Sequence, residues 1–493
     1  MTASVLIVGA GPVGMTLASE LARYGVHARI VDKAPHRTDK SKAMVLWSRT
    51  LELLDRGDGG AAPFVNAGFK IDGVVFMARD EVVGRVAMDM IPSTHNYALA
   101  LPQSETERLL EERLASQGVF IERGVEVTMI TPDACGADAV LRHPDGREEA
   151  VRADWLLGCD GAHSIVRHAL NVPFEGETLL SDWFLADVHM TGYPRPDTDA
   201  SVHWHKDGVL LIFPIQAGRY RVIGDLPATA DKVSPTPTLA QVQQLVDRRG
   251  PAGTKLHDPV WLSGFRINGR KVTGYRHGHT FLAGDAAHIH SPAGGQGMNT
   301  GMQDAINLAW KLALVLRNEA DESLLDTYSP ERSAVGDEVL KAAERLTSVA
   351  TLRNPIAQRL RNLAGHFALG FSHFTRGVAQ TMSEVTVHYP HSPLNGPSVH
   401  GMKPGERVAP TSDHAPAGSG VRPVFALFAA PTAAVKQLIN AYPGLLDDNV
   451  RPPLQADTIS LVRPDGYLAC SASEADTIAA YLDRLTARHG VPA

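Results

Sequence analysis

Three short glycine-containing stretches hold the residues of this chain that could do chemistry. They lie far apart in the sequence: Gly9-Ala10-Gly11-Pro12-Val13-Gly14, Cys159-Asp160-Gly161-Ala162-His163-Ser164 and Gly284-Asp285-Ala286-Ala287-His288. In the first stretch, the three glycines permit a tight turn, close approach of the backbone to a pyrophosphate and close packing of the next helix. The pattern predicts that a dinucleotide binds near the amino-terminal end of the chain.

The residues around the first stretch support this prediction. The run from Ser4 to Val8 is typical of a strand that is buried on both faces. A helix is expected from about Gly11 to Tyr24, and a second apolar strand ends at Asp32. An acid at this spacing hydrogen-bonds a ribose, and an acid in place of arginine favours an adenosine without a 2′-phosphate. The pattern therefore predicts FAD or NAD rather than NADP.

The composition is that of an ordinary globular protein with a sizeable core. Hydrophobic residues make up 44% and charged residues 20% of the 493 residues, a length that suits roughly two to four domains. The formal net charge of -7, without a concentrated basic stripe, speaks against nucleic acid as a partner. No apolar run reaches membrane-spanning length, and three scattered cysteines form neither a disulfide framework nor a zinc site. We expect a cytoplasmic protein without a membrane or nucleic-acid partner.

The pattern of elements changes along the chain and predicts an α/β protein. Residues 1–180 alternate strands and helices, which predicts the first part of a Rossmann-like domain. Residues 181–275 are mostly strand-like segments between Gly and Pro turns, which predicts an inserted, mostly antiparallel sheet. Residues 276–390 return to the first domain, with a helix from about Met298 to Arg317 and further helices. Residues 391–493 are expected to form a linker and a small α/β domain.

The second and third stretches resemble the motifs of a known family. The pattern Asp-Gly-x-x-Ser-x-x-Arg is formed by Asp160, Gly161, Ser164 and Arg167. The third motif extends beyond His288, through the loop that follows it, to Asn299. With the first stretch, they make the whole chain similar to the group A flavoprotein monooxygenases, the superfamily of para-hydroxybenzoate hydroxylase. The branch it resembles has three domains and contains phenol hydroxylase, aromatic polyketide hydroxylases and rifampicin monooxygenase.

This resemblance implies that FAD is the cofactor and assigns residues to it. Asp285 would hydrogen-bond the ribityl chain, Asp160 would lie near the pyrophosphate and the nicotinamide route, and Gln103 would contact the flavin. Lys42 stands where many relatives carry arginine; it keeps the charge but loses the bidentate fork. The expected FAD-binding residues are Gly9, Gly11, Pro12, Val13, Gly14, Asp32, Lys33, Lys42, Gln103, Asp160, Gly161, Gly284, Asp285, Pro292, Gly295, Gln296, Gly297, Met298 and Asn299.

The loop after the third stretch is expected to approach the isoalloxazine ring. Only glycine lets a backbone come so near, which fits Gly294 to Gly297. The helix that begins near Met298 would direct its positive end at the ring. Pro292 and Gly295 are therefore the expected catalytic-loop positions, and the sequence identifies no catalytic base.

Four residues of the inserted sheet are candidates to line the substrate pocket: His203, His205, Phe213 and Arg221. Period-two alternation predicts that only about half of them face the ring. The histidine pairs of the chain lack a carboxylate or cysteine at a suitable spacing, so no metal is expected. Near the carboxyl end, Arg463 to Cys470 resembles the close of a thioredoxin-like domain. That domain is expected to be redox-inactive because the chain has no Cys-x-x-Cys.

The resemblance implies an NAD(P)H-dependent FAD monooxygenase that hydroxylates an electron-rich aromatic substrate, phenolic or polyketide-like. NADH or NADPH would reduce FAD, and molecular oxygen would react to give a flavin C4a-hydroperoxide, which delivers the hydroxyl group. Two alternatives stay open: a group A flavoprotein performing Baeyer–Villiger oxidation or epoxidation, and a non-catalytic FAD-binding protein. A flavin halogenase is disfavoured because its Trp-x-Trp-x-Ile-Pro signature is absent. We expect a small aromatic substrate and a chain that acts as a monomer or homodimer.

Overall fold

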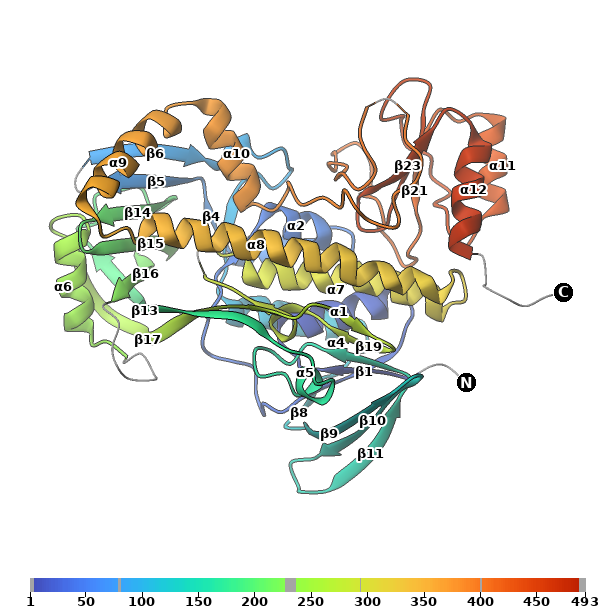
Figure 1. Cartoon of the computed structure of the whole chain (residues 1–493), viewed down its shortest axis with the longest axis horizontal. Helices are drawn as coiled ribbons and strands as arrows, with labels where there is room; N and C mark the ends of the chain where they lie inside the picture. Colours follow the sequence, from blue (N-terminus) through green and yellow to red (C-terminus); the bar gives the residue numbers. More distant parts are fainter. Residues whose placement is uncertain (1–3, 79–80, 227–235, 293, 400, 487–493) are drawn as a thin grey trace.

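Two large sheets and a small carboxyl-terminal unit form the part of the chain that the computed structural model describes, residues 4–78, 81–226, 236–292, 294–399 and 401–486 (Figure 1). The two large sheets lie side by side, and two long helices run past both of them (Figure 1). Within the described residues, no helix is long and apolar enough to cross a membrane.

The first large sheet is mainly parallel. Its elements and the helices beside it are β1 (Val5–Val8), α1 (Pro12–Arg23), β2 (Ala28–Asp32), α4 (Gln103–Ser116), β8 (Glu122–Arg123), β12 (Trp155–Gly158), α5 (Ile165–Ala169), β18 (Arg276–His277), β19 (Thr280–Leu282) and α7 (Gly297–Leu316). The strand order is β18-β19-β12-β1-β2-β8. β1 is buried at every position and pairs in parallel with β2 and β12, as its continuous apolar sequence predicts. α1 packs against α4 and α7.

Two smaller sheets accompany this one. The first contains β3 (Val45–Leu46), β4 (Phe69–Ile71) and β7 (Ala98–Ala100), next to the short helices α2 (Ser48–Leu54) and α3 (Ala62–Ala67). The second is an antiparallel meander of β9 (Glu126–Asp133), β10 (Gly136–Arg142) and β11 (Glu148–Ala153). β3 and α2 matter most here because they bring residues 45–47 close to the loop before α7.

The expected antiparallel insertion is present and takes in more of the chain than residues 181–275. Its strands are β5 (Gly73–Ala78), β6 (Glu81–Ala87), β13 (Glu175–Thr191), β14 (Asp199–His205), β15 (Gly208–Gln216), β16 (Arg219–Leu226), β17 (Lys255–Lys271) and β20 (His288–Ile289), in the order β20-β17-β13-β16-β15-β14-β5-β6. β5 pairs in parallel with β14. β5 and β6 thus join this sheet from the first domain, a long-range pairing that no local pattern announces.

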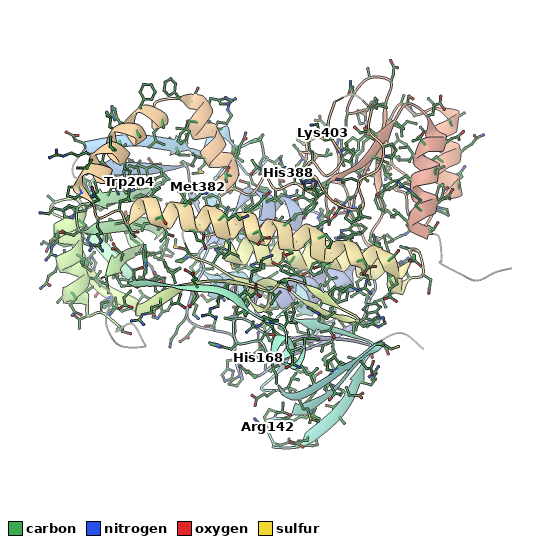
Figure 2. The ribbon with its side chains drawn as sticks, viewed as in Figure 1. Arg142, His168, Trp204, Met382, His388 and Lys403 are labelled. Carbon is green, nitrogen blue, oxygen red and sulfur yellow. The ribbon has the colours of Figure 1, made fainter. Side chains whose placement is uncertain are left out.

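Helices cover both faces of the eight-stranded sheet. α6 (Leu239–Arg249) begins with a capping box at Thr238, and its Val242 and Val246 pack on Leu210 and Val222. The other face meets α8 (Tyr328–Ala350), α9 (Pro355–Leu369) and α10 (Ser372–Met382), which lie over β17 and β6. Figure 2 places Trp204 under α9 and Met382 at the end of α10.

The carboxyl-terminal unit is a small α/β body fused to the core of the first domain. It contains β21 (Ala426–Phe428), α11 (Ala433–Ala441), β22 (Ile459–Val462), β23 (Leu468–Ala472) and α12 (Ala475–Thr486). The three strands are antiparallel, and short parallel bridges at Leu446 and Arg451 extend the sheet. Tyr24 at the end of α1 and Trp310 of α7 belong to the same apolar core as this unit.

Candidate active site

The glycine turn between β1 and α1 has the shape of a phosphate site. Gly9 has a φ of +100°, and a Cβ there would lie 2.4 Å from the Cys159 carbonyl oxygen. A Cβ at Gly14 would lie 1.9 Å from the Gly9 carbonyl oxygen, so both positions require glycine. Gly11, in contrast, faces open space, with nothing within 4 Å of its Cβ position. That space adjoins the start of α1, where unpaired N–H groups and the helix dipole favour an anion.

Pro12 and Val13 complete this turn in different ways. Pro12 is the first residue of α1. An N–H at this position has no acceptor within the helix, so proline, which lacks an N–H, loses no hydrogen bond there. Val13 packs into the third motif, since a Cβ at either Gly284 or Gly301 would lie 2.7 Å from its Cγ2. The first and third motifs are therefore in direct contact.

The Asp32 carboxylate holds the glycine turn in place. Its Oδ2 accepts a hydrogen bond from the Ala10 N–H at 2.6 Å, and its Oδ1 accepts one from the Ala34 N–H at 2.8 Å. Arg123 Nη1 lies 3.9 Å from the same carboxylate. The neighbouring Lys33 is exposed. A ribose contact by Asp32 stays a prediction, while its role in ordering the turn follows from these bonds.

Asp160 offers an unpaired oxygen to the same region. Its Oδ2 accepts hydrogen bonds from the N–H groups of Ile165 at 2.6 Å and Val166 at 3.3 Å, at the start of α5. Its Oδ1 is buried without a hydrogen-bond partner among the described residues. Burial raises the pKa of Asp160, and the bonds from Ser164 and the start of α5 oppose that rise. Gly161 beside it has a φ of +79° and open space at its Cβ position.

Arg167 connects the second motif to the third. Its Nη2 donates to the Ala162 carbonyl at 2.7 Å, and its Nη1 donates to the Ala286 carbonyl at 3.1 Å. Ser164 of the same motif caps α5 by accepting a hydrogen bond from the Arg167 N–H at 3.0 Å. All three motifs therefore converge on one edge of the parallel sheet.

Asp285 lies at this edge, in the turn that follows β19. Its side chain is exposed, yet the surrounding protein desolvates it enough to raise its pKa, a shift that the charges of His288 and Lys42 oppose. The charge of Lys42 therefore lies near this carboxylate. Contact of Asp285 or Lys42 with a cofactor stays a prediction.

The loop before α7 approaches β3 and α2 closely. Gly294 and Gly295 have φ values of +91° and +65°. A Cβ at Gly295 would lie 3.6 Å from Val45 Cβ and 3.8 Å from Trp47 Nε1. Trp47 Nε1 donates to the Gly294 carbonyl at 2.9 Å. Pro292 is exposed and Met298 is half-buried at the start of the helix. Trp47 is a part of the site that the sequence did not single out.

Three predicted ligand residues are occupied in holding the surrounding backbone. Asn299 accepts from the Trp47 N–H at 2.8 Å and donates to the carbonyls of Val45 at 2.8 Å and Gly295 at 3.1 Å. Gln296 Nε2 donates to the Thr381 carbonyl at 3.0 Å. The side chain of Gln103 contacts the Ala43 N–H at 3.3 Å and Glu107 Oε1 at 2.9 Å. These side chains shape the loop, and their contact with a cofactor stays a prediction.

A buried ion pair under the third motif was not predicted. Asp304 Oδ2 accepts from the Gly284 N–H at 3.0 Å and lies 2.7 Å from His288 Nε2, while Arg332 Nε donates to Oδ1 at 2.6 Å. Burial alone would raise the pKa of Asp304, but Arg332 and His288 hold it below its ordinary value. The pair fixes the turn that carries Asp285. Asp304 lies on α7 and Arg332 on α8, 28 residues apart, so no local spacing in the sequence predicts that they pair.

Strand register divides the four substrate candidates between the two faces of the eight-stranded sheet. Phe213 is directly opposite Arg221, and His203 is directly opposite Leu210. Because faces alternate along a strand, Leu210 and Phe213 point to opposite faces. Phe213 packs with Val45 and Trp47, beside the glycine loop. Leu210 packs under α6, and His203 shares that face.

The structure therefore corrects the assignment of His203 and His205 to the pocket. His203 is buried, its Nε2 lies 2.8 Å from Ser201 Oγ, and burial lowers its pKa to about 4. Ser201 Oγ in turn lies 2.8 Å from the Tyr193 hydroxyl. His205, two residues further along β14, shares this face and contacts the Asp207 N–H at 3.2 Å. Both histidines belong to the core on the α6 side.

Arg221 lies on the same face as Phe213, but its guanidinium group binds other parts of the protein. Its Nε and Nη2 bind the Asp187 carboxylate at 2.7 and 2.9 Å, and its Nη1 and Nη2 donate to the carbonyls of Lys42 at 3.0 Å and Ser41 at 2.6 Å. The side chain is fully buried. Arg221 thus positions the segment that carries Lys42.

A cavity of about 920 Å³ adjoins the glycine loop on the side of β17 and α8. It is lined by polar residues, among them Lys271, Asp337 and Glu344, and by His290 and Ser291 directly before Pro292. The His290 Nε2 atom is buried without a partner among the described residues and lies 3.5 Å from the Cβ position of Gly297. Burial lowers the pKa of His290 to about 4.

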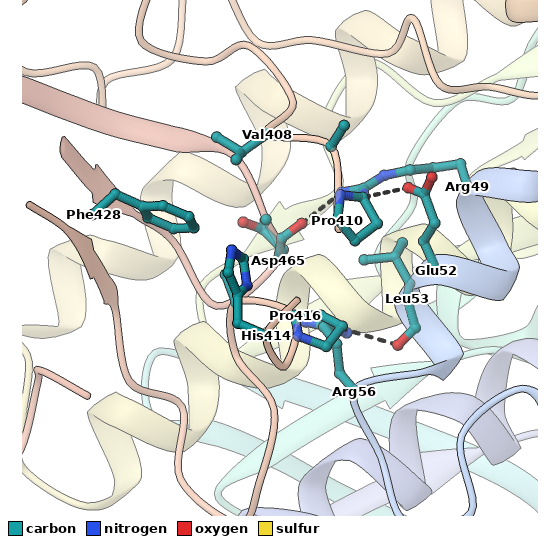
Figure 3. A pocket seen from close by; sticks show the side chains of 13 residues that line it. Arg49, Glu52, Leu53, Arg56, Val408, Pro410, His414, Pro416, Phe428 and Asp465 are labelled. Carbon is teal, nitrogen blue, oxygen red and sulfur yellow. Dashed lines mark hydrogen bonds and ion pairs between the residues drawn. The ribbon is translucent and has the colours of Figure 1, made fainter. Parts of the chain in front are cut away.

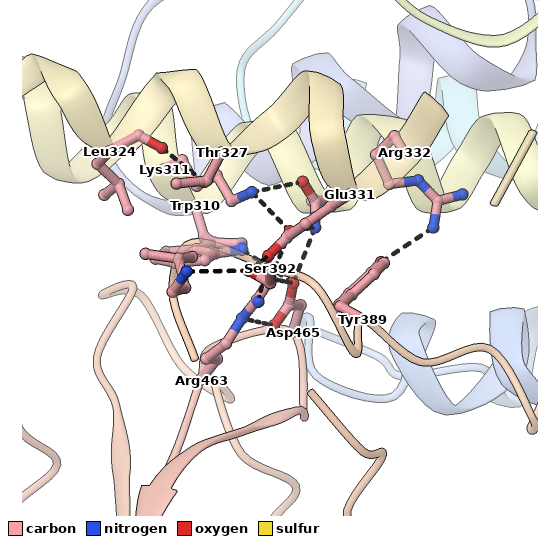
Figure 4. A network of polar contacts seen from close by, with 12 residues as sticks. Trp310, Lys311, Leu324, Thr327, Glu331, Arg332, Tyr389, Ser392, Arg463 and Asp465 are labelled. Carbon is pink, nitrogen blue, oxygen red and sulfur yellow. Dashed lines mark hydrogen bonds and ion pairs between the residues drawn. The ribbon is translucent and has the colours of Figure 1, made fainter. Parts of the chain in front are cut away.

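The carboxyl-terminal unit meets α7 and α8 through a second buried ion cluster (Figure 4). Arg463 binds Glu331 at 2.6 and 2.9 Å and Asp465 at 2.7 Å, and Lys311 donates to Glu331 at 2.7 Å. Although burial would raise the pKa of Glu331, Arg463 and Lys311 hold it below its usual range. Cys470 is buried, and burial raises its pKa to about 12.

A small cavity of about 30 Å³ separates this unit from α2 (Figure 3). Arg49 and Glu52 line it on one side, and His414 and Phe428 line it on the other. Its volume suits a bound water rather than a substrate. Arg49 Nη2 donates to the Asp465 carbonyl at 2.6 Å, so this arginine joins α2 to the carboxyl-terminal unit.

Comparisons with known proteins agree with this geometry. The family described as "FAD binding domain" matches residues 2–343. The chain is 35% identical to 6-methylpretetramide 4-monooxygenase of Streptomyces rimosus, over 99% of this chain and 94% of that protein. It is 34% identical to pentachlorophenol 4-monooxygenase of Sphingobium chlorophenolicum, over 70% and 65% of the two chains. The solved structure of an anhydrotetracycline hydroxylase from Streptomyces rimosus superposes with a TM-score of 0.79 at 29% identity, covering 99% of each chain.

Proposed function

The chain belongs to the FAD-dependent aromatic monooxygenases, and from this premise we propose that it hydroxylates a fused-ring phenolic substrate of the aromatic polyketide type. A reduced nicotinamide nucleotide, NADH or NADPH, is the proposed electron donor. Baeyer–Villiger oxidation, epoxidation and a non-catalytic role are not favoured, because the relatives from Streptomyces rimosus and Sphingobium chlorophenolicum are named monooxygenases and hydroxylases.

The residues at the edge of the parallel sheet fit FAD. The open space at Gly11 and the start of α1 would take the pyrophosphate. Asp285 would accept hydrogen bonds from the ribityl hydroxyls, and the unpaired Oδ1 of Asp160 leaves an acceptor free for a further donor. Bound FAD supplies the activation of molecular oxygen that no amino-acid side chain can perform.

The chain itself orients the reactants and excludes water. The glycine backbone at 294 and 295 would let the ring lie against the loop, which Trp47 and Asn299 hold rigid. The N-terminus of α7 follows directly and would stabilise negative charge on the bound ring. A rigid loop of this kind places the substrate carbon and the oxygen donor at reacting distance, and a dry pocket prevents wasteful loss of oxidising equivalents.

The observation that carries the substrate class is the apolar cluster beside this loop. Phe213, Phe76 and Val202 are half-buried on the sheet and belong to the same cluster as Val45 and Trp47. Apolar and aromatic neighbours of this kind suit a fused-ring substrate better than a small polar phenol. The cavity beside His290 and Ser291 is the proposed entrance. The names of two relatives, a 6-methylpretetramide 4-monooxygenase and an anhydrotetracycline hydroxylase, support the same class.

The nicotinamide nucleotide is proposed to dock transiently. The sequence holds a single Gly-x-Gly-x-x-Gly turn, and the site built on it is assigned to FAD. A nucleotide without its own domain must bind at the surface for the time of the hydride transfer. We therefore expect saturation by NADH or NADPH only at high concentration.

Turnover with a matched substrate series tests the proposal. Purified holoenzyme is given NADH or NADPH with tetracyclic, tricyclic and monocyclic phenols, and the product mass is measured. The proposal requires faster nucleotide oxidation with fused rings and a product heavier by one oxygen atom. Equal rates with monocyclic phenols would contradict the fused-ring preference, and a product without added oxygen would contradict hydroxylation.

A further inference from the structure

The outer face of α9 and the start of α10 carries an unpartnered apolar stripe. The inner side of α9 packs on Trp204, which Gly365 approaches closely and Arg361 covers. The outer side is exposed (Figure 2). The stripe consists of Ile356, Leu360, Leu363, Phe367, Phe371 and Phe374, with side chains between 48% and 71% exposed.

These six side chains form one contiguous surface. Residues 356, 360, 363 and 367 follow helical spacing along α9, so they share one face. The rings of Phe367 and Phe371 lie 4.9 Å apart and continue the stripe onto α10. Large exposed apolar side chains that adjoin one another in this way are uncommon on a protein that acts alone in water. Such a surface marks an interaction site rather than scattered exposed residues.

The charge around the stripe identifies the kind of partner. Residues 345–383 contain five arginines and two histidines but no Asp or Glu, in a chain whose net charge is -7. Arg353 and Arg361 are engaged with neighbouring protein groups. Arg345, Arg359 and Arg376 are exposed, and Arg359 lies one residue before Leu360, at the border of the stripe. A local basic excess beside exposed Phe and Leu side chains complements an anionic, apolar surface.

A second copy of the chain suits this surface less well. In a two-fold interface the same patch meets itself, so that this basic surface would be placed against an equally basic one. Like charges placed against each other oppose association. The helices also lie at the edge of the molecule, beyond the sheet that they cover, which gives a flat surface free access (Figure 1).

We propose that α9 and the start of α10 bind the surface of an anionic lipid membrane, with the apolar stripe entering the headgroup region and the arginines contacting lipid phosphates. This is attachment from one side, and it requires no spanning helix. It would hold the enzyme where poorly soluble apolar substrates partition.

Vesicle sedimentation of the full-length, FAD-loaded protein tests the proposal. The probes are phosphatidylcholine vesicles with and without phosphatidylglycerol. The Leu363→Glu/Phe367→Glu double variant should lower binding to the anionic vesicles roughly tenfold or more, because two charges would enter the apolar region. Phe120→Glu is the matched control, since Phe120 is 77% exposed but lies outside the stripe. It should bind like the wild type.

A second pair of measurements separates charge from apolar contact. Arg359→Gln/Arg376→Gln should reduce binding to anionic vesicles and weaken its dependence on salt. Unchanged melting temperature and FAD content would show that the variants are folded. Absence of vesicle binding by the wild type would overturn the proposal. So would a dimer of the wild type that the Leu363→Glu/Phe367→Glu variant dissociates, because the stripe would then be a contact between two copies.

Discussion

Arg332 Nε lies 2.6 Å from Asp304 Oδ1, and both side chains are fully buried directly under the turn that carries Asp285. Removing one partner of such a pair leaves an uncompensated charge in the core. We predict that Arg332→Ala lowers the free energy of unfolding by about 3–5 kcal/mol. Guanidinium denaturation measures it. Arg152→Ala, which breaks an exposed pair with Asp133, is the control and should leave the midpoint nearly unchanged. Equal effects would contradict the special role of the buried pair.

Loss of the Asp285 carboxylate should weaken FAD binding. We predict that Asp285→Ala lowers the FAD affinity by about 1–3 kcal/mol, the scale of a hydrogen bond to a charged group. Binding should also weaken as the pH falls through the raised pKa of Asp285, because hydroxyl donors favour the ionised carboxylate. Flavin fluorescence titration measures both effects. Asp138→Ala, at an exposed position of β10, serves as the control, and an equal loss there would refute the assignment.

The pH dependence of stability should report Glu384. Burial raises its pKa to about 7, while it accepts hydrogen bonds from Thr300 Oγ1 and Gln303 Nε2 at 2.7 and 2.6 Å. Between pH 4.5 and about 7 the folded protein keeps a proton that the unfolded chain has lost, so stability should fall as the pH rises, by up to about 3 kcal/mol. Glu384→Gln should flatten this part of the curve. An unchanged slope in the variant would contradict the prediction.

Substitution of Gly295 should uncouple nucleotide oxidation from hydroxylation. Its φ of +65° strains any β-branched residue, and a side chain would enter the space expected for the ring. We predict that Gly295→Val raises the hydrogen peroxide formed per nucleotide oxidised. Gly146→Val is the matched control, because Gly146 has a φ of +85° in the turn between β10 and β11. The same peroxide yield in both variants would show that strain alone causes the effect.

The two faces of the eight-stranded sheet can be separated kinetically. Phe213→Ala should raise KM for the aromatic substrate roughly tenfold, the scale of lost apolar contact in a pocket. His203→Ala should lower the melting temperature and leave KM unchanged, because His203 lies on the α6 face. Steady-state kinetics and calorimetry on both variants distinguish the faces. A raised KM for His203→Ala would contradict the register argument.

The features that sequence predicted best depend on local geometry. The glycine turn, its flanking strands and the helix at Gly297–Leu316 were predictable because spacing and backbone constraint lie within one short segment. Alternation along β14 and β15 could say only that about half the candidates face the site. The pairing of strands decides which half, and pairing is set by contacts between distant residues.

Long-range partners escaped prediction for the same reason. Trp47 reaches the glycine loop across 247 residues, and Arg221 reaches the Lys42 segment across 179. The sequence has a suitable residue at each end of these contacts, but nothing in either segment identifies which distant segment it will contact. β5 likewise joins the second sheet by pairing with β14, far along the chain, and β6 follows by pairing with β5.

The contact between Arg463 and Glu331 has a consequence for folding during synthesis. The Arg463 guanidinium neutralises Glu331 of α8, in the core that lies against α7. During synthesis on a ribosome, α8 emerges some 130 residues before this partner. Until then Lys311 is the one cation that the described residues place against this buried carboxylate. We therefore expect the core between α7 and α8 to reach its full stability only after the carboxyl-terminal unit has been synthesised.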